Sequence, residues 1–431
     1  MGDFLRLLRT NRNYRYAWTG QIVSEIGDHF NNIAVFSLAL HATGSGLVVS
    51  GVMLARAIPA VLAGPVAGVA LDRLDRRTVM IASDLMRAVV ALGFVVAVDH
   101  PRPALLFTLS ALLMFASPFF TSGRAAILPS IARADELHTA NALSQTTQWT
   151  TLTIGTVAAG LSAAHLGYRA AFLLNSVSFL FSAWAIWQMR LPAAHAARPG
   201  ASLTEAQVAR PWHEYVEGLR YMRRHPLLIG IALLGVGWAS GGGAAQILFT
   251  LFGEVVFGRG PAGIGIIWGC AGVGLVAGGA LAHWLGPRLT FAAYKRLVPA
   301  CYLVHGGAYI VFSQMDDFGW ALVFIALSRA AIGVSSVLNM TLLLRHVAAE
   351  FRGRVFATNE SLVWGTMLLS MLAAGLASQH VSPRVIGLWA GVLSALTAAY
   401  WVWADRAGLL RDAPPLGVAR KEVEIRPELR V

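Results

Sequence analysis

Residues 68–77 read GVALDRLDRR and form a short charged segment between two long apolar runs, 46–70 and 77–98. A membrane-spanning helix needs about 20 mostly apolar residues, because the hydrocarbon core of a bilayer is about 30 Å thick. Both runs reach that length. The segment therefore predicts a tight hydrophilic turn at the membrane surface between two spanning helices.

The same alternation continues through the whole chain of 431 residues, of which 56% are hydrophobic and 13% charged. A soluble domain carries about 25% charged residues, so this chain is expected to bury much of its surface in lipid. We predict an all-α polytopic membrane protein with about twelve transmembrane helices in two pseudo-symmetric six-helix bundles. The runs are 16–40, 46–70, 77–98, 104–127, 141–164, 169–190, 227–252, 261–283, 296–315, 320–344, 355–378 and 384–404.

Basic residues set the expected orientation. Most of the 34 Lys and Arg residues fall in connections on the side of the N-terminus, and the connections on the other side hold only Arg102, Arg169, Arg259 and Arg384. Under the positive-inside rule this predicts that both termini are cytoplasmic. The net charge of +12 sits in short loops rather than on one solvated face, which argues against a nucleic-acid partner.

Two pairs of similar stretches indicate an internal repeat: 68–77 with 279–288, and 157–169 with 372–384. Residues 157–169 read VAAGLSAAHLGYR, and residues 372–384 read LAAGLASQHVSPR. Together with the long connection after the sixth run, they predict four parts. These are an N-terminal bundle at 1–190, a cytoplasmic linker at 191–226 with an amphipathic stretch, a C-terminal bundle at 227–404 and a poorly ordered cytoplasmic tail at 405–431.

Enzyme chemistry is not indicated. There is no phosphate-binding loop, no Cys/His set with metal-ligand spacing and no nucleophile–base pattern, so we expect no metal, no cofactor and no catalytic residues. Cys270 and Cys301 lie inside apolar runs, where neither suggests a disulfide.

The first apolar run carries the most informative polar residues. They recur at helical spacing and so form a polar stripe on one face of the helix, made up of Gln21, Glu25, Asp28, His29 and Asn32. A carboxylate at membrane depth is costly unless it faces a cavity or a partner. Glu25 or Asp28 could carry a proton or bind a cationic group. The alternative is a structural ion pair that holds this helix to a neighbour.

Arg56, in the second run, lies at a depth comparable to that of the two carboxylates. It could neutralise one of them and leave the other free to titrate, or it could bind an anionic substrate group. The spacing does not decide between these two roles.

The charged loop is a candidate cytoplasmic gate. Gly68 permits close approach of the helices. Asp72 can cap a helix or pair with a cation, and the arginines that follow it can bond helix ends or carboxylates of the opposite half. The alternative is a positive-inside anchor. Asp84 and Arg87, one helical turn apart in the third run, are expected to pair and to extend this network. The gate residues are Gly68, Asp72, Arg73, Arg76, Arg77, Asp84 and Arg87.

Further residues are candidates for lining a central cavity. Three consecutive glycines, 241–243, predict a local break in the seventh run. The other candidates, for each of which a structural role is the alternative, are Gln21, Trp238, Gln246, His305, Arg329 and Asn339.

The pattern G-x-x-x-D-R-x-x-R-R at 68–77 resembles the signature loop of the major facilitator superfamily, with Asp75 where the family usually has glycine. The stretches 20–34, 128–143 and 350–357 are similar to the branch with enterobactin exporters, macrolide efflux proteins and lysophospholipid transporters. GTVAAG at 155–160 resembles the family's exporter signature, with Thr156 and Ala159 in place of Pro and Gly.

This resemblance implies a secondary active transporter that works by alternating access. It favours proton-coupled efflux of an amphipathic small molecule, such as a drug, a siderophore or a lipid-like compound, by a monomer in the bacterial cytoplasmic membrane. The implied partners are the cargo, protons and the lipid bilayer. The alternatives are uptake, uncoupled facilitated movement, or a sensor or scaffold that transports nothing.

Overall fold

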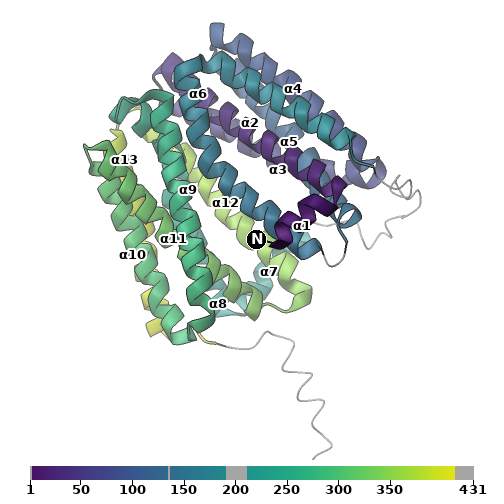
Figure 1. Ribbon diagram of the computed structural model, residues 1–431. Helices are drawn as coiled ribbons and strands as arrows, with labels where there is room; N and C mark the ends of the chain where they lie inside the picture. Colours follow the sequence, from purple (N-terminus) through teal and green to yellow (C-terminus); the bar gives the residue numbers. More distant parts are fainter. Residues whose placement is uncertain (1, 134–135, 191–210, 413–431) are drawn as a thin grey trace, which may run out of the picture. The chain divides into compact units, whose positions relative to one another are not determined.

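A computed structural model describes residues 2–133, 136–190 and 211–412. The described chain is built of helices without strands (Figure 1), as expected. The helices are α1 (Gly2–Thr10), α2 (Arg12–Thr43), α3 (Gly46–Arg73), α4 (Arg76–Asp99), α5 (Pro103–Ile131), α6 (Leu137–Trp187), α7 (Pro211–Arg223), α8 (Pro226–Leu251), α9 (Gly260–Leu285), α10 (Phe291–Gln314), α11 (Phe318–His346), α12 (Arg352–Ala377) and α13 (Pro383–Arg406). Short helical turns at Phe252–Val256, Gly286–Arg288 and Ala349–Phe351 join some of them.

Each of the twelve expected spans coincides with one of these helices, or with one part of α6, over nearly its whole length; 169–190 ends three residues beyond its helix, and 227–252, 296–315 and 355–378 end one residue beyond theirs. Nine helices in the described ranges are long and apolar enough to cross a membrane. One of them, α6, contains two spans, because Gly167 (φ 81°, ψ 168°) breaks its helical backbone. The remaining long helices, α2 and α10, are more polar. Large apolar side chains such as Val61, Val89 and Leu369 are exposed on the helix surfaces, as is expected of side chains that face lipid.

Local sequence explains where several helices begin and end. The side chain of Asn11 accepts a hydrogen bond from Tyr14 N at 3.0 Å and caps α2, and Asp75 caps α4 by accepting from Thr78 N at 2.9 Å. Gly44, with φ 64°, ends α2 in the left-handed conformation that glycine adopts at least cost.

The chain divides into two compact units. Among the described residues, unit 1 comprises 2–133, 136–190, 247–272 and 374–383, and unit 2 comprises 211–246, 273–373 and 384–412. In unit 1 a cluster around Tyr14, Met80 and Phe120 packs α2, α4 and α5 together. In unit 2 the main cluster surrounds the fully buried ring of Trp401. The four-part division expected from the sequence stays a prediction.

The structure describes part of the linker, 211–226, and part of the tail, 405–412. The amphipathic stretch forms α7, whose Met222 is buried in the main cluster of unit 2, whereas 191–210 lies outside the described residues. The first part of the tail is more ordered than expected: Asp405 bonds Lys295, Leu410 is 3% exposed and Asp412 pairs with His346. A single apolar side chain, Leu410, anchors this polar segment. Residues 413–431 lie outside the described part.

Candidate functional site

Glu25, on α2, is held by three donors from within unit 1. Arg124 on α5 donates to its Oε1 at 3.3 Å, Gln21 donates to the same oxygen at 2.8 Å, and Thr151 on α6 donates to Oε2 at 2.9 Å. The side chains of Glu25 and Arg124 are 22% and 18% exposed. With donors at both oxygens, this carboxylate is satisfied in its ionised form.

Asp28, one turn further along α2, belongs to a second cluster. Its Oδ2 lies 3.9 Å from Arg87 Nη1, and Arg87 also bonds Asp84 on its own helix, α4. Arg87 and Asp84 are almost fully buried, whereas the Asp28 side chain is 27% exposed. Asp84 and Arg87 therefore pair as expected, but their further partner is Asp28 rather than the loop arginines.

The guanidinium of Arg87 lies between two aromatic rings. Its carbon is 4.7 Å from the centroid of Phe120 on α5 and 4.3 Å from that of Phe179 on α6. Such contacts stabilise a desolvated cation and fix its position. Among the described residues, Asp28 Oδ1 and Asp84 Oδ2 are buried without a hydrogen-bond partner. Arg87 is thus a fixed cation shared by two carboxylates, of which Asp28 is the more loosely held and the more accessible.

Arg56 does not bond either α2 carboxylate in the described structure. Its guanidinium donates to the side-chain oxygen of Asn31 at 2.9 Å and to that of Asn32. Arg56 thus contacts two side-chain amides directly, and both roles considered for it, neutralising an acid and binding an anionic substrate group, stay predictions. His29 packs against α6, where a Cβ at Gly155 would lie 2.8 Å from its ring.

The charged loop bonds the ends of neighbouring helices in unit 1. Arg76 donates to Ala126 O at 2.8 Å, and Arg77 donates to Ile186 O at 3.3 Å near the end of α6. Cations placed at helix carboxyl ends match the helix dipole. Asp72 and Arg73 are exposed, and Gly68 has open space where a Cβ would stand.

Three of the candidates in the second half of the sequence come together in unit 2. His305 on α10, Arg329 on α11 and Gly241 on α8 line one small pocket with Tyr309. The His305 ring is 2.8 Å from Ser328 Oγ, which fixes its orientation. The glycines 241–243 remain helical, so the expected break is absent; they admit close packing instead, with a Cβ at Gly241 only 2.2 Å from Ala390 O.

The remaining candidates in unit 2 do not line that pocket. Asn339 accepts a hydrogen bond from Tyr294 OH at 2.7 Å and thereby ties α11 to α10. Trp238 packs beside Gly242, and Gln246 is partly buried near the end of α8.

A pocket of about 460 Å³ opens in unit 1 between α2, α5 and α6. Arg124 is its one charged lining residue, with Tyr14, Trp18 and Gln21 among its walls. Arg124 was not among the residues predicted from the sequence, because it stands near the end of an apolar run and close to the basic loop that follows. The described residues contain no group of three His, Cys, Asp or Glu placed to hold a metal ion.

Comparisons with known proteins agree with this architecture. The model of the Major Facilitator Superfamily matches residues 17–365. The multidrug efflux pump Tap of Mycolicibacterium fortuitum is 28% identical over 81% of this chain and 85% of its own length. Macrolide efflux protein A of Streptococcus pyogenes is 22% identical over 87% of this chain and 92% of its own. Among solved structures, the nucleoside transporter NupG aligns with a TM-score of 0.70 and 11% identity, covering 90% of this chain and 99% of that one, which shows a shared fold.

Proposed function

The chain belongs to the major facilitator superfamily, and from this premise we propose that it is a proton-coupled exporter of amphipathic small molecules. Its relatives include efflux proteins for macrolides and for multiple drugs. Both are matched along most of their length, which supports export as the direction and a drug-like compound as the cargo.

The proposal depends on one observation: Asp28 has only a long contact with its cationic partner, Arg87. Coupling to protons needs an acid within the membrane that can take up and release a proton while its surroundings stay in place. Glu25 has donors at both oxygens, and Asp84 is fully buried beside Arg87. Asp28 alone combines partial exposure, a partner at 3.9 Å and a buried oxygen without a partner. We therefore assign the proton to Asp28.

Arg87 gives the coupling a mechanism. When Asp28 is ionised, the fixed guanidinium is attracted by two carboxylates; when Asp28 is protonated, Arg87 retains only Asp84. Protonation thus weakens the tie between α2 and α4, and α2 is the helix that carries the polar stripe. Cargo binding beside this helix and proton binding at Asp28 can therefore exclude one another, which is the requirement for exchange.

The pocket beside Arg124 supports an amphipathic cargo. Aromatic rings at Tyr14 and Trp18 offer apolar contact area, and Gln21 and Arg124 offer hydrogen bonds. Sites for small organic molecules combine these two properties. Gln21 and Arg124 also bond Glu25, so cargo that contacts either side chain in this pocket would change the hydrogen bonds of Glu25 on α2.

The test is an accumulation screen of a compound library in cells that contain or lack the protein. We expect lower accumulation of a subset of amphipathic compounds, and we expect a proton uncoupler to abolish the difference. Export that persists in the uncoupler would indicate another energy source or facilitated movement. Equal accumulation of every compound would favour uptake of another substrate or a sensor role.

A further inference from the structure

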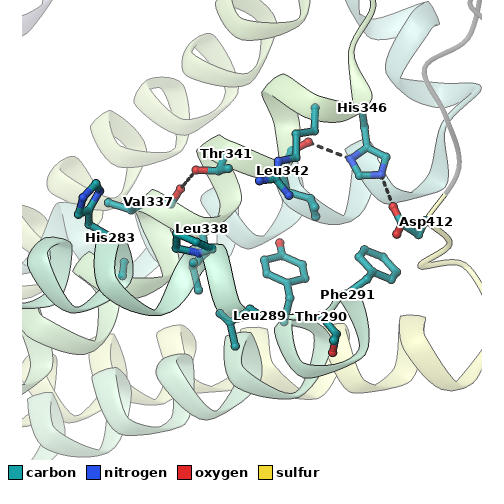
Figure 2. A pocket seen from close by; sticks show the side chains of 15 residues that line it. His283, Leu289, Thr290, Phe291, Val337, Leu338, Thr341, Leu342, His346 and Asp412 are labelled. Carbon is teal, nitrogen blue, oxygen red and sulfur yellow. Dashed lines mark hydrogen bonds and ion pairs between the residues drawn. The ribbon is translucent and has the colours of Figure 1, made fainter.

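A second pocket lies within unit 2, at the ends of three spanning helices. It has a volume of about 450 Å³ and lies where α9 and α11 end and α10 begins. Figure 2 shows its residues, with His346 and Asp412 at one end and His283 at the other. Because Asp412 belongs to the segment after α13, this pocket is on the same side of the membrane as the C-terminus.

The walls of the pocket are amphipathic. Leu338, Leu342 and Phe291 provide an apolar surface, while Arg345 and His283 provide exposed basic groups. The amino end of α10, where Thr290 caps the helix, also faces the pocket and favours negative charge. An apolar wall with a basic rim fits a molecule that has both an acyl chain and an anionic group.

At one end of the pocket, His346 has a partner at each of its two ring nitrogens. Its Nδ1 is 3.0 Å from Leu342 O, and its Nε2 is 2.8 Å from Asp412 Oδ1 (Figure 2). A backbone carbonyl only accepts hydrogen bonds, so Nδ1 donates to Leu342 O, and the carboxylate of Asp412 lies against the other ring nitrogen. The His346 side chain is 6% exposed, so the ring is buried and a carboxylate already occupies this end of the pocket.

The carboxylate of Asp412 lies in the pocket but is only weakly held there. Gly408 turns the chain with φ 70°, and Leu410 inserts beside Gly230 and Trp401, which carries the following residues to the pocket. The Asp412 side chain is nevertheless 62% exposed. An exposed carboxylate on a terminal segment can leave its partner at small cost, provided that another anion takes its place.

We propose that this pocket binds a phosphate-bearing lipid of the adjoining leaflet, and that Asp412 occupies the phosphate position when no lipid is bound. The phosphate contacts His346 and Arg345, and an acyl chain lies along Leu338 and Leu342. Lipid binding then releases the C-terminal segment from α11. The alternative is a purely structural role, in which Arg345 and His346 only complement the dipole at the end of α11.

Native mass spectrometry of the purified full chain in detergent tests this site. Titration with phosphatidylglycerol should show tighter binding of the first lipid than titration with phosphatidylcholine. Arg345→Gln should weaken the binding of phosphatidylglycerol about tenfold, as loss of a charge-assisted contact does. The matched control is Arg296→Gln, an exposed arginine of α10 that does not line the pocket, and it should bind as the parent does.

Asp412→Asn distinguishes lipid binding from the purely structural role. Removal of a competing carboxylate should tighten the binding of phosphatidylglycerol, whereas the loss of a purely structural ion pair would leave it unchanged. Equal binding of the two lipids, equal effects of Arg345→Gln and Arg296→Gln, or unchanged binding in Asp412→Asn would each overturn the proposal. Inorganic phosphate serves as a separate arm: competition at millimolar concentration would overturn the lipid assignment, and failure to compete supports it.

Discussion

At the scale of single residues, Asp28 differs from the other acids of the cluster by how weakly it is held. We expect Asp28→Asn to abolish gradient-driven export while protein abundance in the membrane stays similar, because asparagine keeps the shape but cannot carry the proton. Export of a compound identified by the accumulation screen measures this. Asp99→Asn is a matched control, since Asp99 pairs with Arg169 at a 53% exposed position outside the cluster. Active export retained in Asp28→Asn would remove Asp28 from the coupling role.

Glu25 and Arg124 offer a second residue-scale prediction. Arg124→Gln should lower the stability of the protein by roughly 1–3 kcal/mol, because it leaves a mostly buried carboxylate without its cation. The double variant Glu25→Gln with Arg124→Gln should recover part of that loss, since no lone charge remains. Thermal unfolding of the purified protein in detergent compares the variants. A double variant less stable than both single variants would contradict the direct pairing.

The polar stripe on the first span could be predicted from spacing, but its partners could not. Helical periodicity places Glu25 and Asp28 on one face because both belong to a single rigid element. Which cations they meet depends on how α4, α5 and α6 pack against that face, and single-sequence spacing has no access to this. Arg56, comparable in depth, bonds amides instead, whereas Arg87 and Arg124 reach the carboxylates.

At the scale of helices, the contact between α2 and α6 depends on a glycine. A Cβ on Gly27 would stand 1.9 Å from Ser178 Oγ and 2.9 Å from the side-chain oxygen of Asn175. Gly27→Ala should therefore push the two helices apart and cost about 1–3 kcal/mol, as overpacking does. Gly64→Ala, in α3 with no atom within 4 Å of the added Cβ, should be neutral or gain about 0.5–1 kcal/mol. Thermal unfolding measures both, and equal stability of the two variants would show that Gly27 does not set the contact.

Helix positions were largely predictable because apolar length is set by the bilayer, a constraint that acts on each span separately. The sixth span followed from the same length argument, although α6 continues to it through Gly167. The order of the segment 405–412 was not predictable. The position of this segment depends on one residue, Leu410, whose side chain packs beside Gly230 of α8.

At the scale of the whole molecule, orientation follows from the distribution of arginines, which is far denser on the side of both termini. Each basic loop is costly to translocate, so we predict that the side richer in arginine is cytoplasmic. The prediction is testable in a chain whose two cysteines, Cys270 and Cys301, are replaced by serine. Arg102→Cys, in an outer connection, should react with a membrane-impermeant maleimide in intact cells. Arg288→Cys, in an inner connection, should react only after permeabilisation, and the reverse pattern would invert the assigned topology and place the lipid pocket at the opposite leaflet.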